Sequence, residues 1–384
     1  MEPLLRDTYV EINLDNIAFN MRKIKETVGD EVAIAAVVKA NGYGHGAVDI
    51  AQTIMENGGD YLAVATLTEA LELRKHYQDY KIFIMGYTPD EYLEYVVKNN
   101  ISQTIFSLKQ ANLLNELGLK YKQKPAVQIK YDTGFNRIGY KDSQESIDEI
   151  DKMFDLENIE IEGIFSHFAL AGKDEDEIQY NKLMNAVKQL EDKGRKFKYK
   201  HICDSIAAIN YPQYRLNMIR PGAIIYGLKS YHDDSIVLKQ AMTFKTKIYH
   251  IKTLNKGEGV SYDYLWKAQD ISRVATLPFG YADGYPRNMR DKGFVTIHGQ
   301  KAPILGVICM DQCIVDISHI PQANVGDEVI IYGDGENNTL SINDVSKLAQ
   351  TNKNELVCRI TIRTPRVYIK DKQVYKILNY LIRD

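Results

Sequence analysis

The residues best suited to chemistry begin at Lys39, which follows an uncharged apolar run at 32–38 and precedes Ala-Asn-Gly-Tyr-Gly-His-Gly. Such a run predicts a strand buried on both faces. In parallel α/β proteins, ligands bind at the carboxyl ends of the strands. A lysine there can lose its proton readily and act as a nucleophile or base. The alternative is an ordinary solvated ammonium group at a strand end.

Polar and reactive side chains also stand at the ends of later apolar runs. They are Lys130 with Asp132, His167, Ser205 and Arg220. Because the carboxyl ends of parallel strands meet at one edge, we expect these side chains to lie close together. The sequence therefore predicts a single site built around Lys39.

The segments that position these residues alternate between strand and helix patterns. The predicted strands are residues 32–38, 61–65, 81–85, 101–106, 126–130, 159–166, 199–203 and 218–226. The predicted helices between them are residues 47–56, 68–76, 89–98, 108–117, 143–154, 177–193 and 205–209. Strict alternation favours a parallel sheet, and about eight such units are typical of an α/β chain with a TIM-type (β/α)8 barrel. An open doubly wound sheet is the alternative. A further helix, with apolar positions from Ile17 to Val28 and a cap at Asp15, precedes the alternation.

The character of the chain changes near residue 240. From Met242 onward, short apolar runs alternate with turns rich in Gly, Asn and Asp, which predicts a mainly β structure with hairpin tips at 299–300 and 371–372. In this part, only 342–348 has a helical pattern. We therefore expect a barrel domain at 1–240 and a β-rich domain at 241–384, with residues 1–12 as a candidate to associate with the latter.

Composition narrows the class of protein. The chain has 384 residues and a formal net charge of -3, which favours neither nucleic acid nor an anionic membrane as a partner. No apolar run approaches the roughly 20 residues that span a bilayer, and the N-terminus has no secretory signal pattern. The four cysteines show neither paired metal spacing nor a disulfide framework. We expect no metal site and a reducing cytoplasm as the location.

The segment from Val38 to Gly46 resembles the pyridoxal 5'-phosphate (PLP) lysine signature of the alanine racemase family. The resemblance runs over nearly the whole chain and implies an N-terminal barrel followed by a C-terminal β-domain. It implies that Lys39 forms the Schiff base with PLP and that Tyr43 lies on the phosphate side.

Further motifs follow in the order that the family has. The segment from Lys130 to Gly139 resembles the one in which Arg137 approaches the cofactor and the substrate carboxylate. The resemblance implies that Lys130 can carry a carbamate, which would turn a cation into an anion able to hold Arg137. Residues 166–169 resemble the histidine segment, in which His167 orients its neighbours within the active site. A satisfied structural histidine is the alternative.

Two segments resemble the family's cofactor-binding motifs. Ser205 and the backbone beside Gly222 and Ala223 are suited to a dianionic phosphate. A plain helix cap is the alternative for Ser205. The resemblance places Arg220 at the pyridine nitrogen, and because a guanidinium stays protonated, that nitrogen should stay unprotonated. This pairing disfavours decarboxylation and transamination. A structural ion pair is the alternative for Arg220.

In the second domain, Gly-Val-Ser-Tyr262 resembles the segment with the second base. Racemisation removes a proton on one face and returns it on the other, so Lys39 and Tyr262 would act on opposite faces. The resemblance further implies Tyr281 near the substrate entrance, the Met310 N–H on the substrate carboxylate, and Asp311 as its support. It also implies a homodimer in which each site combines one subunit's barrel with the other's β-domain.

The sequence thus predicts a PLP-dependent alanine racemase that interconverts L- and D-alanine for bacterial peptidoglycan. Some family members have a tyrosine where this chain has Ile362, which keeps a serine or broad-range racemase as the alternative. Alternatives from other classes are a PLP-dependent decarboxylase, a barrel-only PLP carrier without catalysis, and a barrel enzyme without PLP. A decarboxylase should have an acid in place of Arg220, and a carrier should lack Tyr262.

Overall fold

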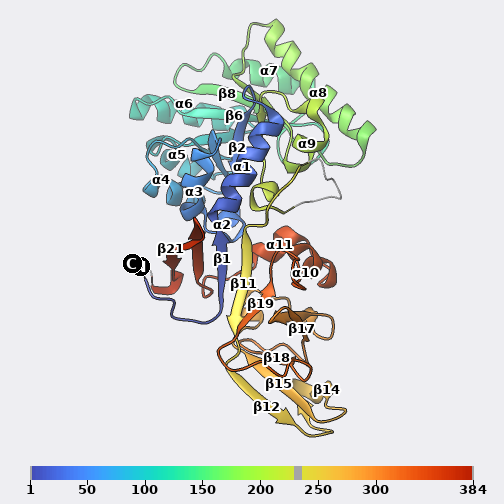
Figure 1. Cartoon of the computed structure of the whole chain (residues 1–384). Helices are drawn as coiled ribbons and strands as arrows, with labels where there is room; N and C mark the ends of the chain where they lie inside the picture. Colours follow the sequence, from blue (N-terminus) through green and yellow to red (C-terminus); the bar gives the residue numbers. More distant parts are fainter. Residues whose placement is uncertain (1, 229–235, 383–384) are drawn as a thin grey trace.

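The computed structural model describes residues 2–228 and 236–382 (Figure 1). Residues 1 and 229–235, which fall in the expected barrel domain, and residues 383–384, which fall in the expected β-rich domain, lie outside the described residues. The two halves are stacked, with the barrel above the C-terminal strands in Figure 1.

The barrel consists of parallel strands in the order β10-β2-β3-β4-β5-β6-β8-β9. Their bounds are β2 (Ala33–Val37), β3 (Tyr61–Val64), β4 (Ile82–Ile84), β5 (Ser102–Ile105), β6 (Ala126–Asp132), β8 (Glu160–Phe165), β9 (Tyr199–His201) and β10 (Met218–Ile219). The last strand pairs with the first, and strand order follows the sequence without the reversal of a doubly wound sheet. The expected TIM-like arrangement is therefore confirmed, as a near-barrel that is closed less fully between β9 and β10.

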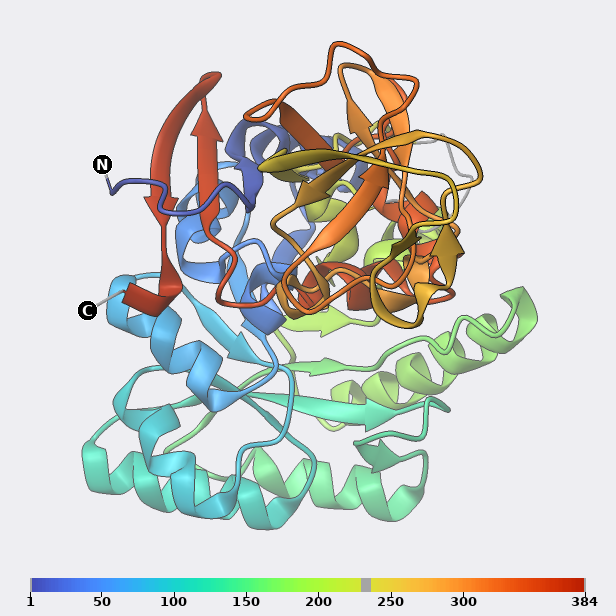
Figure 2. The same ribbon diagram turned by 90° about the horizontal axis from the view of Figure 1, so that it is seen from below.

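Helices cover the outside of this near-barrel (Figure 1, and Figure 2 in a view from below). They are α1 (Leu14–Val28), α3 (Ala47–Glu56), α4 (Leu67–His76), α5 (Leu93–Lys98), α6 (Leu108–Tyr121), α7 (Gln144–Met153), α8 (Lys173–Asp192) and α9 (Ser205–Asn210). Burial on both faces leaves β2 and β3 almost wholly apolar, whereas β5 buries the polar residues Ser102, Gln103 and Thr104. In β3 every residue is buried, and in β2 all residues but the first are.

The β-rich part is built on a seven-stranded sheet in the order β17-β16-β19-β11-β1-β20-β21. Its members are β1 (Tyr9–Asn13), β11 (Met242–Lys247), β16 (Phe294–Ile297), β17 (Gln300–Pro303), β19 (Glu328–Tyr332), β20 (Arg366–Lys370) and β21 (Gln373–Leu378). A smaller sheet contains β12 (His250–Leu254), β15 (Ser272–Leu277) and β18 (Cys313–Asp316). The N-terminal strand β1 lies between β11 and β20, so the chain begins in this sheet and then enters the barrel.

Several local expectations can be compared with these elements. Both hairpins are present, because β16 pairs with β17 and β20 with β21. The tip at 371–372 is confirmed, but the first tip lies at 298–299 rather than 299–300, since Gln300 already pairs with Ile297. The helix at 342–348 is confirmed as α10 (Ile342–Leu348), but it is not the only one there, since α11 (Lys353–Cys358) follows it. The cap of α1 is wrong: Asn13 accepts the Asn16 N–H, and Asp15 lies inside the first turn. None of the helices among residues 2–228 and 236–382 is long and apolar enough to cross a bilayer.

Candidate active site

Lys39 lies directly after β2, where the chain leaves the buried strand. Val38 before it is fully buried and Lys39 is half-buried. Burial and the Arg137 guanidinium lower the pKa of Lys39, while the Glu69 carboxylate opposes this shift. Glu69 also accepts the Ala40 N–H at 2.6 Å, so its carboxylate fixes the backbone next to the lysine. The lowered pKa makes the neutral, basic form of Lys39 more accessible than in water.

Residues 40–43 form a turn with left-handed backbone angles. The φ angles of Ala40, Asn41, Gly42 and Tyr43 are 51°, 53°, 60° and 53°. This conformation is unfavourable for residues with a side chain, and it tends to occur at functional sites. The sequence predicted only a glycine loop here. The turn brings Tyr43 back toward the barrel, where it is buried.

Arg220 is fixed on all sides by hydrogen bonds inside the barrel. Its Nη1 donates to His201 Nδ1 at 2.6 Å, and its Nη2 donates to the Ser166 carbonyl at 2.7 Å and to the Ile202 carbonyl at 3.0 Å. Because His201 Nδ1 accepts this bond, His201 Nε2 carries the proton and donates to Gln128 Oε1 at 2.6 Å. Burial lowers the pKa of Arg220 to about 10, so the guanidinium remains charged at neutral pH.

His167 faces the same guanidinium. Arg220 Nη2 donates to His167 Nδ1 at 3.3 Å. Burial, followed by the positive charges of Arg220, Arg137, Lys130 and Lys39, lowers the pKa of His167 to about 3. The imidazole is therefore neutral, and His167 orients its neighbours rather than holding a charge.

Lys130 is buried beside these cations. Its Nζ donates to the Tyr131 carbonyl at 3.1 Å and lies 5.5 Å from the centre of the Phe165 ring. Burial and the charges of Arg220 and Arg137 lower the pKa of Lys130 to about 7, against the opposing effect of Asp132. Arg137 itself is exposed and lies over the Phe135 ring, which in turn contacts the His167 ring.

The phosphate-binding candidates meet around Gly222. The Gly222 N–H donates to Ser205 Oγ at 2.8 Å, and a Cβ on Gly222 would lie 2.7 Å from Tyr43 Oη. A side chain at position 222 would therefore collide with Tyr43 and fill the space between the Tyr43 and Ser205 hydroxyls. Ser205, Gly222 and Ala223 are all buried, and Asp204 caps α9 so that the backbone after it is fixed.

These residues fit PLP. Four basic side chains, Lys39, Lys130, Arg137 and Arg220, all lie close enough to His167 to lower the pKa of its imidazole. Guanidinium groups such as those of Arg137 and Arg220 suit the phosphate of a cofactor and the carboxylate of an amino acid. The hydroxyls of Tyr43 and Ser205 can donate to a phosphate, and the Gly222 N–H fixes the Ser205 hydroxyl.

The candidates from the β-rich part lie together, but apart from the barrel residues. Ser261, next to Tyr262, donates to the Val307 carbonyl at 2.6 Å, and the Tyr281 N–H donates to the Cys309 carbonyl at 3.2 Å. Tyr262 is 67% exposed and Met310 is 52% exposed. Among the hydrogen bonds and ion pairs of the described residues, none joins Tyr262, Tyr281, Met310 or Asp311 to the barrel site residues. One chain therefore presents two separate groups of candidates.

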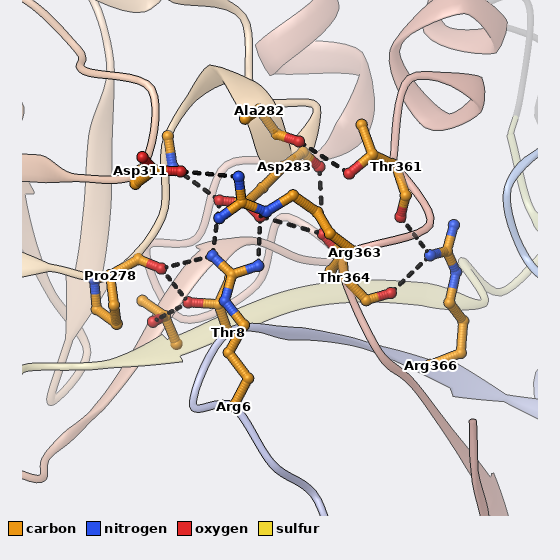
Figure 3. A network of polar contacts seen from close by, with 12 residues as sticks. Arg6, Thr8, Pro278, Ala282, Asp283, Asp311, Thr361, Arg363, Thr364 and Arg366 are labelled. Atoms are coloured by element: carbon orange, nitrogen blue, oxygen red, sulfur yellow. Dashed lines mark hydrogen bonds and ion pairs between the residues drawn. The ribbon is translucent and has the colours of Figure 1, made fainter. Parts of the chain in front are cut away.

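A buried carboxylate fixes the loops of the second group (Figure 3). Asp283 is fully buried; it accepts two hydrogen bonds from the Arg6 guanidinium and one from the Gly280 N–H at 3.0 Å. Arg363 lies 3.3 Å from the same carboxylate and donates to Asp311 at 2.7 Å. The loops at 280–283 and 310–311 are thus joined through Asp283 and Arg363, in a geometry anchored by Arg6 from the N-terminal segment.

Sequence reasoning missed several of these positioning groups. Arg6, Asp283 and Arg363 act over long separations along the chain and carry no local pattern that assigns them. Glu69 offered a signal, because Thr66 and Glu69 form a capping box at the start of α4. That pattern predicts a helix start but not the bond to Ala40.

Comparisons with known proteins match the whole chain. Residues 12–230 match the family model described as "Alanine racemase, N-terminal domain", and residues 241–368 match "Alanine racemase, C-terminal domain". An alanine racemase of Clostridium tetani is 43% identical over 388 residues, covering 98% of this chain and 99% of that protein. The solved alanine racemase of Clostridium difficile 630 has a TM-score of 0.94 at 38% identity, covering 99% of this chain and 100% of its own. An alanine racemase from Bacillus anthracis, solved with bound L-Ala-P, has a TM-score of 0.92 at 30% identity, with 99% of each chain covered.

Proposed function

The chain belongs to the alanine racemase family, so it is a PLP-dependent enzyme that racemises alanine, and we propose that Lys39 and Tyr262 are its two bases. The gathering of Lys39, Lys130, Arg137 and Arg220 around His167 at the carboxyl end of the barrel is the observation that supports this site most directly. Because the family match covers both halves of the chain, the decarboxylase, the barrel-only carrier and the PLP-free enzyme are excluded.

When bound, PLP withdraws electrons from the substrate and so acidifies the Cα proton. In our proposal, Lys39 holds the cofactor covalently, and Tyr43, Ser205, Gly222 and Ala223 bind its phosphate. Arg220 faces the pyridine nitrogen as a fixed cation, and His167 supports Arg220 on the side facing the site. Hydrogen bonds already hold Arg220, His167 and Ser205 in place, so these three side chains need little reorganisation when the cofactor enters.

The proposed proton path uses one base on each face of Cα. Lys39 is suited to this role because its lowered pKa favours the neutral amine. Tyr262 lies in a loop where Ser261 and Asp263 both have φ of 61°, a strained backbone that is typical of functional positions. Arg137 and the Met310 N–H would bind the substrate carboxylate, with Asp311 in support and Tyr281 near the entrance.

We propose that two copies of the chain share their active sites. The division into a barrel domain at 1–240 and a β-rich domain at 241–384, with residues 1–12 associated with the latter, would underlie this sharing. The main support is the exposure of functional side chains that should be covered when substrate is bound. Tyr262, Met310 and Ile362 are exposed in one chain. In a symmetric dimer, the β-rich part of each copy could cover the barrel site of the other.

Mixing two inactive variants should restore activity if the sites are shared. Dimers of Lys39→Ala chains and dimers of Tyr262→Phe chains are unfolded, mixed and refolded together. Random pairing makes about half of the dimers mixed, and each mixed dimer has one of its two sites intact, so about a quarter of wild-type activity should return. Sites contained within one chain would give no recovery. Refolding each variant alone is the control.

Lys130 is expected to carry a carbamate at neutral to alkaline pH. The neutral amine reacts with CO2, and a pKa of about 7 makes that form abundant above pH 7. At a fixed concentration of dissolved 13CO2, a carbamate carbon signal in the NMR spectrum should grow as the pH rises through about 7 and fade below it. Lys130→Arg, which keeps the charge but cannot form a carbamate, is the control. A wild-type spectrum without this signal at pH 8 would contradict the assignment.

Alanine should be the main substrate despite Ile362. An apolar side chain near a small substrate changes discrimination by only about 1–3 kcal/mol. We expect kcat/KM for alanine to exceed that for serine and lysine by about tenfold or more. Equal or better kcat/KM for serine would favour the broad-range alternative. Measurements in both directions, with coupled assays for each enantiomer, would decide this.

We also propose that the enzyme works in the cytoplasm and supplies D-alanine for peptidoglycan. All four cysteines are free thiols, which agrees with a reducing compartment. A bacterial strain that lacks this chain and any second racemase should then need D-alanine to grow. Growth without D-alanine would contradict the biosynthetic role.

A further inference from the structure

The left-handed turn after Lys39 needs support from outside itself. Its φ angles remain positive at Gly44 (78°) and Gly46 (94°), so most of residues 40–46 lie in a region that residues with side chains avoid. The turn makes internal hydrogen bonds, from the Gly42 N–H to Val38 at 2.8 Å and from the Gly46 N–H to Asn41 at 2.9 Å. Such a strained conformation persists only where the surrounding structure holds it.

Three side chains near the C-terminal end of the same chain hold this turn: Arg366 and Tyr368 from β20, and Tyr380 from a short 3-10 helix after β21. Arg366 Nε donates to the Gly44 carbonyl at 3.2 Å, and Tyr368 Oη donates to the His45 carbonyl at 3.1 Å. Tyr380 Oη accepts from Asn41 Nδ2 at 2.9 Å. In Figure 1, the dark red C-terminal strands, of which β21 is labelled, lie below and to the left of α2, the label that covers Lys39–Tyr43.

The fit between the turn and this region is close. A Cβ on Gly46 would lie 1.9 Å from Tyr368 Oη, and a Cβ on Gly44 would lie 2.2 Å from the Val357 carbonyl in α11. Any side chain at position 44 or 46 would therefore clash with these groups, and the positive φ angles also favour glycine at both positions. The turn is packed against the C-terminal strands and α11 and is not a free loop.

The supporting groups are themselves fixed. Arg366 is 1% exposed, and its remaining N–H groups donate to the Ile360, Thr361 and Thr364 carbonyls at 3.0, 2.7 and 2.6 Å (Figure 3 shows the last two). Tyr368 is fully buried. Its hydroxyl also lies 3.2 Å from Asp49 Oδ2. A rigid support of this kind can impose a strained conformation on its neighbour.

We propose that Arg366, Tyr368 and Tyr380 are positioning residues that keep the turn at 40–46 closed, so that Lys39 and Tyr43 hold PLP at its two ends. The proposal rests on the cofactor roles proposed above for Lys39 and Tyr43. In this proposal the β-rich part has a second role. Through these three residues it supports the barrel site of its own chain, whereas its Tyr262 serves the site of the partner.

The test uses Tyr368→Phe and Tyr380→Phe in the full-length enzyme. Tyr332→Phe is the matched control, because Tyr332 is fully buried in the same sheet and its hydroxyl contacts Met242 Sδ at 3.8 Å. Hydrogen exchange of peptides covering 40–46 reports whether the turn opens, and a PLP titration reports cofactor affinity. Thermal unfolding separates both effects from general destabilisation.

Each test variant should speed hydrogen exchange in the turn by about fivefold and weaken PLP binding by a similar factor, as expected for one lost hydrogen bond. Tm should match that of Tyr332→Phe. Exchange and PLP affinity equal to those of the control would overturn the proposal, and so would a rise in exchange spread evenly over the chain. If the wild-type enzyme did not attach PLP at Lys39, the proposed function would fail, whereas exchange in the cofactor-free chains would still decide whether these residues hold the turn.

Discussion

Lys39→Ala is expected to lower kcat/KM for alanine racemisation by a factor on the order of 10^4 or more, as the loss of a covalent catalytic group does in other enzymes. The substitution removes both the attachment point of PLP and one of the two proposed bases. Neighbouring lysines cannot replace it, because Lys130 is buried on another strand and donates to the Tyr131 carbonyl.

The absorption spectrum tests the same substitution independently of activity. Lysine-bound PLP absorbs in the violet, where protein alone does not. The wild-type enzyme should show this band after PLP addition and Lys39→Ala should lack it. Lys200→Ala is the control, because Lys200 also lies on a barrel strand but forms an ion pair with Glu191. A violet band that stays with the Lys39→Ala protein after unbound PLP is removed, and that borohydride reduction abolishes, would show that the attachment site is elsewhere.

The near-barrel could be predicted because its strands are covered on both faces. Burial on two faces favours apolar runs such as those of β2 and β3, and these runs are visible one at a time in the sequence. Strand β5, with Ser102, Gln103 and Thr104 buried, departs from this pattern. Local rules were ambiguous at the element ends. Both Asn13 and Asp15 are good caps, and only the backbone geometry selects Asn13. The short helix α11 has too few residues for its period to be seen.

The sequence predicted which residues form the site, but it could not predict their protonation states or their contacts. Strand-end residues such as Lys39, His167 and Arg220 stand out in the sequence. The neutral state of His167 and the low pKa of Lys130 depend instead on charges from several strands, which no local pattern contains. The same holds for Arg6 and Asp283, which lie 277 positions apart and meet as an ion pair.

The conformation of the left-handed turn at 40–46 could not be predicted from its own sequence. Its glycines predict flexibility when read alone, yet the turn is held by Arg366 and Tyr368 from the other end of the chain. A sequence that looks permissive can thus encode a fixed conformation when distant residues supply the constraint.

Tyr262→Phe is the second large effect that we expect, with racemisation falling by about 10^2–10^4-fold while PLP remains bound. Phenylalanine keeps the ring and removes only the proton-carrying hydroxyl. Tyr264→Phe is the matched control, because Tyr264 lies in the same loop and is 63% exposed, against 67% for Tyr262.

Deuterium exchange at Cα tests the two faces of the substrate separately. Lys39 would remain in place in Tyr262→Phe, so it should still exchange the Cα proton of the one enantiomer whose proton faces it. Exchange from the other enantiomer should be lost, because its proton faces the missing hydroxyl. Equal loss from both enantiomers, or none from either, would contradict a two-base path. Tyr262 makes no hydrogen bond to the barrel site residues among those described in one chain. An enantiomer-selective loss, together with recovery of activity when Lys39→Ala and Tyr262→Phe chains are refolded as mixed dimers, would therefore mean that its hydroxyl reaches the reacting carbon from a second copy.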